Sequence, residues 1–332
     1  MPVTTIKDVA QLAGVSIATV SYVINNGPRP VHRETRARVL QAMEQLGYEP
    51  NVSARRLRLN QTHVIGLAIA GLSGRTGIAD LYFLDTMLGI SAAVDHLEYD
   101  LMLFSHHDRL QSEDFFRSLA RRRMVDGLIA SGGAVNPRGL TLLVEVGLPV
   151  VAVGRQQVAE GVCRIDYSFA DDAYRSTRAL VRRGHRRIGL ILNKPVFQSE
   201  PLRLEGYRRA LAEAGIEYDA QLVFIPPEVV SSPPRQAVDQ LVSQCGATGL
   251  ITTGFTGVCA YLQQIGKAGE GVEVVTLDLH NRAPLPPNLV MGIRQPKFEA
   301  GQRAVELLLD LIQGKAQPQV LLLPSTVEFG EL

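Results

Sequence analysis

The 332-residue sequence has few cysteines and no long apolar run, and each absence excludes a class of protein. The three cysteines, Cys163, Cys245 and Cys259, lie far apart, and no Cys-x-x-Cys pair or histidine cluster has the spacing of a metal site. We therefore expect free thiols in a reducing compartment, and neither a metal ion nor another cofactor. No apolar stretch approaches the roughly 20 residues of a membrane-spanning helix, and residues 1–8 lack the apolar core of a secretory signal. The sequence thus predicts a cytoplasmic protein with no membrane partner.

Motifs that identify enzymes are also missing. The glycine-rich residues 71–77 follow a strand-like run but match neither common pattern for binding nucleotide phosphates, and no Gly-x-Ser-x-Gly is present. No histidine and carboxylate stand at a spacing that requires a catalytic interpretation. We therefore expect no enzymatic activity.

Charge is distributed unevenly along the chain. Residues 1–62 contain eight Lys or Arg and four Asp or Glu, although the whole chain has a formal net charge of only +1. The remaining residues are slightly acidic. A basic head on a mildly acidic body indicates that the head alone contacts a polyanion.

The body, from residue 63 onward, alternates strand-like and helix-like segments. We predict strands over residues 64–70, 101–104, 127–130, 149–153, 188–192, 222–225, 249–252, 272–277 and 289–293. Helical stretches lie between them, near residues 82–97, 112–123, 138–147, 169–184, 201–215, 234–245, 256–268 and 296–313. Parallel strands need a crossover, which is usually a helix, so this order predicts doubly wound α/β sheets.

Two similar series of strands indicate two lobes rather than one. The first runs from about residue 63 to 165 and the second from about 166 to 294. Ligands of open α/β sheets bind beyond the carboxyl ends of the strands, so we expect a ligand site between the lobes.

The head contains no pattern typical of a strand, and its sequence predicts three short helices. Apolar residues recur at helical spacing from Ile6 to Ala13, Gly14 interrupts them, and Ser16 is placed to cap a second helix. A third helix runs from about residue 32 to 46, and Gly47 ends it. Two helices joined by a glycine-bearing turn, with a third packed across them, form a helix-turn-helix.

The second helix has an outward face that a protein core would not use. Its spacing turns Val20, Val23 and Ile24 inward and leaves four residues pointing outward, Ile17, Ala18, Ser21 and Tyr22. Apolar side chains suit thymine methyl groups and base edges in the major groove. The alternative is a three-helix domain that binds protein.

Two segments of the head resemble a known family closely. They are TIKDVAQLAGVSIATVSYVIN from Thr5, and LGYEPNVSARRL from Leu46, preceded by Thr35-Arg36. This head is similar to the DNA-binding domain of the LacI/GalR (lactose-repressor) family, and the two-lobed body resembles that family's periplasmic-binding-protein-like effector domain. The resemblance covers essentially the whole chain.

The resemblance assigns roles to residues of the head. It implies that Ile17, Ala18 and Tyr22 read bases, and that phosphates are held by or near Thr5, Ser16, Thr19, Ser21 and Asn25. Tyr22 stands where Arg or His is frequent in the family, which removes a bidentate contact to guanine.

Residues 50–59 match the hinge helix of the family, which two subunits form side by side in the minor groove. An isolated helix of this length is marginal in water, so we expect it to order only when something holds it. Leu57 matches the leucine that wedges into the central base step, and Ala54 matches a residue beside it. The alternative is a solvated linker with Leu57 buried against the body.

Residues of the body match effector contacts of the family. Arg203 lies near the start of a predicted helix and Asp278 follows a predicted strand, as cleft residues do, although such residues are also common as surface or capping groups. Tyr82 and Phe83 align with the cleft of the first lobe, and the alternative for either ring is the lobe core. Arg155 follows another strand end, and Phe255 falls where the family usually has an Asn-Asp pair.

The sequence therefore predicts a homodimeric regulator of transcription that acts as a repressor and whose affinity for a two-fold-symmetric operator depends on a sugar or nucleoside. Predicted bounds are residues 1–49 for the helix-turn-helix domain, 50–62 for the hinge and 63–332 for the body. Within the body, residues 296–324 return to the first lobe and 325–332 to the second. No heptad repeat follows residue 330, so a dimer is expected. The rival functions are a sugar-binding protein without a DNA role and a sugar-processing enzyme.

Overall fold

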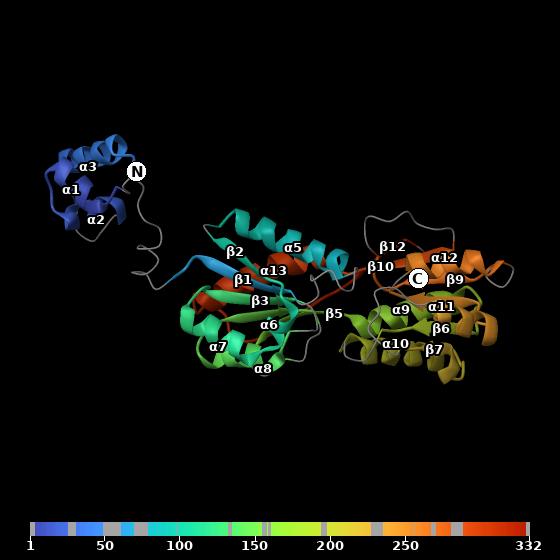
Figure 1. Cartoon of the computed structure of the whole chain (residues 1–332). Helices are drawn as coiled ribbons and strands as arrows, with labels where there is room; N and C mark the ends of the chain where they lie inside the picture. The colour runs from blue at the N-terminus through green and yellow to red at the C-terminus, as the bar shows by residue number, and fades with distance from the viewer. Residues whose placement is uncertain are drawn as a thin grey trace. The chain divides into compact units, whose positions relative to one another are not determined.

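The computed structural model describes residues 4–25, 31–48, 61–69, 79–97, 99–131, 135–154, 158, 161–193, 198–226, 235–253, 255–266, 270–279 and 288–329. Internal contacts divide the chain into two units, Met1–Thr62 and His63–Leu332 (Figure 1).

The first unit is built from three helices, α1 (Ile6–Ala13), α2 (Ile17–Asn25) and α3 (Arg33–Gln45). At the start of α1, the N–H and hydroxyl of Thr5 donate to the Asp8 carboxylate at 2.8 and 2.7 Å, and these bonds lower the pKa of Asp8. Gly14 ends α1 with φ 65°, a conformation that glycine adopts without strain. The helices share one small apolar core, which contains Val9, Ala10, Ala13, Val20, Val23, Val39 and Ala42.

The first sheet of the body has six strands in the order β11-β5-β4-β3-β1-β2, all paired in parallel. Their bounds are β1 (Val64–Ile69), β2 (Asp100–Phe104), β3 (Gly127–Ser131), β4 (Val150–Val153), β5 (Cys163–Tyr167) and β11 (Val320–Leu323). The helices around them are α5 (Ala79–Asp95), α6 (His107–Gln111), α7 (Glu113–Arg122), α8 (Pro137–Glu145) and α13 (Lys297–Ile312). Figure 1 shows α5 and α13 on one face of this sheet and the other three helices on the opposite face. We call these elements the first lobe.

The second sheet has the order β12-β10-β9-β8-β6-β7, and β12 alone is antiparallel to its neighbour. Its strands are β6 (Ile188–Ile191), β7 (Val223–Phe224), β8 (Gly249–Thr252), β9 (Glu273–Thr276), β10 (Leu289–Arg294) and β12 (Thr326–Phe329). The helices are α9 (Phe169–Arg182), α10 (Ser199–Glu213), α11 (Arg235–Val238) with a π-helical continuation (Asp239–Gln244), and α12 (Phe255–Gln264); a 3₁₀ turn spans Ala220–Leu222. Helices α9 and α10 pack on one apolar core of this sheet, and α11 and α12 pack on another. We call these elements the second lobe.

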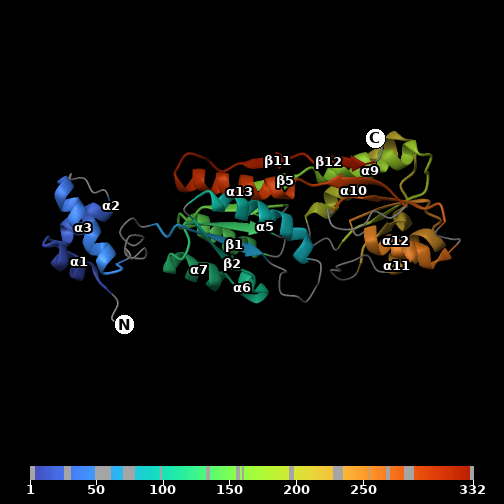
Figure 2. The same cartoon turned by 90° about the horizontal axis from the view of Figure 1, so that it is seen from above.

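The chain passes between the lobes three times within the described residues. It crosses after β5, after β10 and after β11, so residues 168, 295–296 and 324–325 connect the two sheets. Figure 2 shows β11 followed by β12 at the last of these crossings. Any change in the arrangement of the two lobes must therefore involve these three connecting segments.

The predicted fold class is confirmed, and three strands were not foreseen. The missed strands are β5, β11 and β12. The sequence of β5 carries Arg164 and Asp166, which pair with each other at 3.4 Å, and these charges obscure the apolar pattern. Strand β11 lies at a sheet edge, where Val320 and Leu322 are exposed. No helix among the described residues has both the length and the apolar character needed to cross a bilayer.

Candidate nucleic-acid interface and ligand site

Helix α2 presents an apolar outward face. Ile17 is 45% exposed and Ala18 is exposed, whereas Val20 and Val23 are buried in the three-helix core. Ser21 and Tyr22, which the sequence also predicts to point outward, are only half-buried rather than fully exposed. An exposed isoleucine at the first turn of a short helix is unfavourable in water, so this face is suited to contact another molecule.

Polar side chains surround the start of α2. The hydroxyl of Ser16 accepts a hydrogen bond from the Thr19 N–H at 3.1 Å and lies 2.9 Å from the Thr19 hydroxyl. Ser16 therefore caps α2, as the sequence predicts, and its helix N-terminus favours a phosphate. Thr5 caps α1 in the same unit. Asn25 is the last residue of α2, with its side chain outside the described residues, and Ala54 and Leu57 lie outside them altogether.

Arg203 is buried on α10, with 6% of its surface exposed. It donates a hydrogen bond to Glu200, one turn earlier on the same helix, and its guanidinium lies 5.2 Å from the ring centroid of Phe169. Glu200 is itself buried and accepts from the Ser199 hydroxyl and the Asn193 N–H, both at 3.0 Å. The predicted ligand-contacting arginine is thus oriented by a carboxylate and an aromatic ring.

Asp278 follows β9 and is also buried. Its two carboxylate oxygens accept hydrogen bonds from Nζ of Lys297 at 2.6 and 2.8 Å. Burial lowers the pKa of Lys297, and the attraction of Asp278 opposes that effect. The positive charge of Arg203 also lowers the pKa of Lys297, so the two ion pairs Arg203–Glu200 and Lys297–Asp278 interact electrostatically. We call Glu200, Arg203, Asp278 and Lys297 the junction cluster.

A second buried group ties α9 to the last crossing of the chain. Oδ2 of Asp172 accepts from the Ser325 hydroxyl at 2.8 Å, and Oδ1 accepts from Arg175 at 2.7 Å. Arg175 also donates to the backbone oxygen of Ser325 at 3.1 Å. Burial raises the pKa of Asp172 against the opposing effect of these partners. This group fixes the position of residue 325 between the lobes.

None of the other four predicted ligand residues is placed at the junction cluster by the described part of the structure. Phe83 is buried in the apolar core of the first lobe with Ile90 and Leu67, which is the alternative that the sequence left open for its ring. Tyr82 lies in α5 and Phe255 begins α12, but their side chains lie outside the described residues, as does all of Arg155.

Sequence reasoning did not identify Glu200 or Lys297. Glu200 precedes Arg203 by three residues on a helix, which is the spacing of an ion pair and could have indicated it. Lys297 begins α13, where the helix dipole disfavours a cation, so a lysine there signals a specific acidic partner. The partner itself could not be named without the fold.

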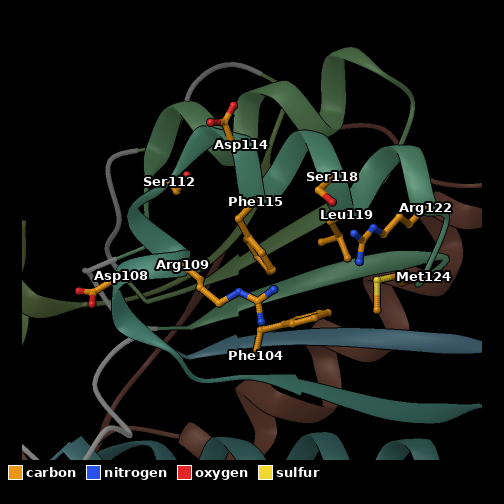
Figure 3. A pocket seen from close by; sticks show the side chains of 10 residues that line it. All are labelled: Phe104, Asp108, Arg109, Ser112, Asp114, Phe115, Ser118, Leu119, Arg122 and Met124. Carbon is orange, nitrogen blue, oxygen red and sulfur yellow. The ribbon is translucent and has the colours of Figure 1, made fainter.

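The first lobe also has a surface pocket of about 450 Å³ beside the end of β2. Figure 3 shows the side chains of Arg109 and Arg122 reaching into it, whereas those of Asp108 and Asp114 point away. The guanidinium of Arg109 lies 5.5 Å from the ring centroid of Phe115. None of the junction cluster lines this pocket, so it is separate from the candidate ligand site. Among the described residues, no three His, Cys, Asp or Glu side chains are grouped to hold a metal ion.

Three family descriptions match the chain. "Bacterial regulatory proteins, lacI family" matches residues 5–51, "Periplasmic binding proteins and sugar binding domain of LacI family" matches residues 78–228, and "Periplasmic binding protein-like domain" matches residues 177–331.

Similar proteins align along nearly the whole chain. The transcriptional repressor PurR of Photobacterium profundum is 28% identical over 317 residues, which are 94% of this chain and 92% of that protein. A solved complex of the transcriptional regulator CelR with cellobiose is 26% identical, with a TM-score of 0.66 and 98% coverage of each chain. The Lac repressor dimer bound to operator and the anti-inducer ONPF shares the fold at 24% identity, with a TM-score of 0.79 and coverage of 98% and 97%.

Proposed function

Because the chain belongs to the lacI family of bacterial regulatory proteins, we propose that it represses transcription as a sequence-specific DNA-binding protein controlled by a small molecule. The observation that carries the proposal is the outward face of α2, on which Ile17 is 45% exposed and Ala18 is exposed, while Val20 and Val23 of the same helix are buried in the three-helix core. An exposed apolar face on the second helix of a helix-turn-helix suits contacts with thymine methyl groups in the major groove.

Three residues of α2 read bases in this proposal. Ile17 and Ala18 contact thymine methyl groups, and Tyr22, which is half-buried on the same helix, contacts a base edge. Ser16, Thr19 and Ser21 hold phosphates around them, and Thr5 and Asn25 do so at the ends of α1 and α2. The first set determines sequence preference, whereas the second mainly determines affinity.

Residues 50–59 form the hinge helix in the proposal, with Leu57 wedged into the central base step and Ala54 beside it. This requires two subunits on one operator, so the active species is a homodimer in the cytoplasm. No catalytic step is part of this function.

The small molecule binds between the lobes, and we propose a sugar or a nucleoside. Arg203 and Asp278 support this because both are buried in the junction cluster, and because planar guanidinium and carboxylate groups hydrogen-bond several hydroxyls at once. Tyr82, Arg155 and Phe255 remain candidates for the rest of the site, whereas Phe83 belongs to the core of the first lobe. The structural relative bound to cellobiose favours a sugar.

A gel-shift selection against genomic fragments tests DNA binding. We expect specific, salt-sensitive binding by the full chain. Tyr22→Ala and Leu57→Ala should weaken specific binding more than non-specific binding, whereas Gln45→Ala on the exposed face of α3 serves as the matched control. Equal loss of both kinds of binding would contradict the roles of Tyr22 and Leu57.

A thermal-shift screen of neutral sugars and nucleosides tests the ligand site, because a ligand that binds only the native state raises its Tm. A chain that binds such a ligand but no DNA fragment would instead support a sugar-binding protein without a DNA role.

A further inference from the structure

The junction cluster contains an ion pair that joins the two lobes. Lys297 begins α13, whose residues Ala300, Ala304 and Leu308 lie in the core of the first lobe. Asp278 follows β9 of the second lobe. The bonds of 2.6 and 2.8 Å between Nζ and the carboxylate therefore cross from one lobe to the other.

This ion pair lies beside a crossing of the chain. Residues 295–296 connect β10 of the second lobe to α13, and Lys297 comes directly after them. A change in the backbone dihedrals of this connection alters the distance between Lys297 and Asp278. Since both side chains are about 3% exposed, water cannot readily replace a partner that is lost.

Asp278 is also the carboxylate to which the proposed ligand binds. Hydroxyl groups of a sugar donate to carboxylate oxygens, and these are the atoms that accept from Lys297. A bound ligand therefore competes with Lys297 for Asp278, or shares its oxygens at longer distance.

Lys297 has a second acidic neighbour on its own lobe. Asp85 of α5 attracts it electrostatically in the present arrangement. The ammonium group can thus lose part of its interaction with Asp278 without being left alone in the protein interior. Lys297 thus bonds to a carboxylate of the second lobe and is attracted electrostatically by a carboxylate of the first lobe.

Gln295 is a further buried polar side chain at this crossing. Its side chain is 4% exposed, and neither its amide oxygen nor its amide nitrogen has a hydrogen-bond partner among the described residues. Buried amides are nearly always satisfied, so this amide offers hydrogen bonds at the crossing that a ligand or another lobe arrangement can use.

We propose that Lys297 is a latch between the lobes, which a ligand on Asp278 loosens, and that it thereby converts ligand binding into a change of lobe arrangement. This inference rests on the proposed function, because it specifies how the proposed ligand site acts on the rest of the body.

Distances between spin labels on the two lobes test the latch without a ligand. Labels are attached to cysteines at the exposed positions Arg121 of α7 and Gln264 of α12, in a Cys245→Ser background that leaves only buried native thiols. We expect Lys297→Met and Asp278→Asn to shift the mean distance between the labels in the same direction or to broaden its distribution. The double variant should show the same change as either single variant, and no larger one.

The matched control is Lys315→Met, which removes an exposed lysine just beyond α13 and should leave the distribution unchanged. If Lys297→Met does not fold, Asp278→Asn decides the question from the other lobe. Wild-type distances in the folded variants would overturn the latch, even if their stability fell, because the pair would then be structural only.

Ligand probes test the second half of the proposal. Cellobiose, ribose and adenosine are added singly, and a probe that raises the wild-type Tm should move wild-type distances towards those of Lys297→Met. The same probe should move the variant by much less. An equal response of both proteins would overturn the coupling role of Lys297.

DNA binding separates this inference from the proposed function. On a selected operator fragment, ligand-free Lys297→Met should differ in affinity from wild type by about fivefold or more, as allosteric coupling energies imply. If no fragment binds wild type, the proposed function fails, whereas the label distances still decide whether Lys297 is a latch.

Discussion

Arg203 and Glu200 show how much a single buried charge depends on its neighbour. Both side chains are less than 10% exposed, and they are bonded to each other on one helix. Removing either one leaves the other charge in a medium of low polarity, which is far more costly than removing both. An arginine that serves a ligand site must therefore be tested together with the carboxylate that orients it.

We predict that Arg203→Met lowers the free energy of unfolding by about 3–5 kcal/mol, because it leaves Glu200 buried without its partner. The double variant Arg203→Met with Glu200→Gln should recover a large part of this loss in urea denaturation. Both variants should lose the ligand-induced Tm shift while keeping operator binding. A normal ligand response in the double variant would remove Arg203 from the site.

Glu273 gives a prediction that depends on pH. Hydrogen bonds from Arg183 at 2.5 and 2.7 Å, and from His185 at 2.9 Å, lower the pKa of Glu273 from 4.5 to about 2. A folded-state pKa below the unfolded value means that the carboxylate stabilises the fold above about pH 4.5, and that this contribution is lost as the pH falls towards 2.

At pH 7, Glu273→Gln should therefore cost about 1–2 kcal/mol, allowing for solvent screening of a partly exposed group. The difference from wild type should shrink steadily below pH 4.5 in chemical denaturation. Glu306→Gln, which breaks an exposed pair with Arg303, is the control and should have little effect at any pH. A difference that does not change with pH would show that hydrogen-bond geometry, not charge, is responsible.

The sequence predicts the environment of a single residue correctly where that environment depends only on the residue's position within its own helix. Ile17 points outward because of helical spacing, and Ser16 caps α2 because serine there accepts from the third residue of the helix. It could not supply the pairing of Lys297 with Asp278, which lie 19 residues apart on different lobes. Long-range partners of this kind follow from topology, which local periodicity does not encode.

At the scale of elements, each lobe packs two helices against each other through glycine. In the first lobe, a Cβ on Gly89 of α5 would overlap the backbone oxygen of Phe298, and one on Gly301 of α13 would overlap that of Thr86. In the second lobe, a Cβ on Gly206 of α10 would overlap the backbone oxygen of Ala170. Close approach of backbones is therefore a shared feature of the two lobes.

Gly301→Ala tests this close approach, because two effects oppose each other. Alanine favours a helix over glycine by about 1 kcal/mol, but overlap with Thr86 forces α5 and α13 apart and costs about 1–3 kcal/mol or more. We predict net destabilisation in thermal and urea unfolding. Ser91→Ala, on the exposed face of α5, should change stability by less than about 0.5 kcal/mol. A more stable Gly301→Ala variant would contradict the packing described.

The elements that sequence reasoning predicted best are those with a strong pattern. Strand β1 is buried at every position and reads as a continuous apolar run, as strands covered on both sides do. Strand β12 could not be recognised, since it is short and its antiparallel pairing with β10 depends on the last crossing of the chain. The boundary of α12 at Gln264 was also placed too late, at residue 268.

At the scale of the whole molecule, the net positive charge is confined to the head, and the body is slightly acidic. The excess of basic residues lies within residues 1–62, which form one unit, whereas the remaining 270 residues carry 26 Lys or Arg and 29 Asp or Glu. The net charge of the body does not attract a polyanion, so we expect the electrostatic part of the DNA-binding free energy to come from the head.

We predict that operator affinity of the full chain falls at least about 10³-fold between 50 and 200 mM salt, because the two heads of the proposed homodimer would together contact six or more phosphates. Residues 63–332 alone should fold and keep the ligand-induced Tm shift but bind no DNA at any salt concentration. Retention of DNA binding by that fragment would place the contact surface on the body and contradict the role of α2.

The three crossings have a consequence for how the chain is made. Strand β11, which completes the first sheet, is synthesised only after β6 to β10 of the second sheet, and β12 is made later still. During translation strand β5 therefore forms an open edge of the first sheet until residues 320–323 have been synthesised. A chain truncated before residue 320 exposes the unpaired edge of β5. We therefore expect such truncated products to be bound by chaperones and degraded rather than to accumulate as a folded first lobe.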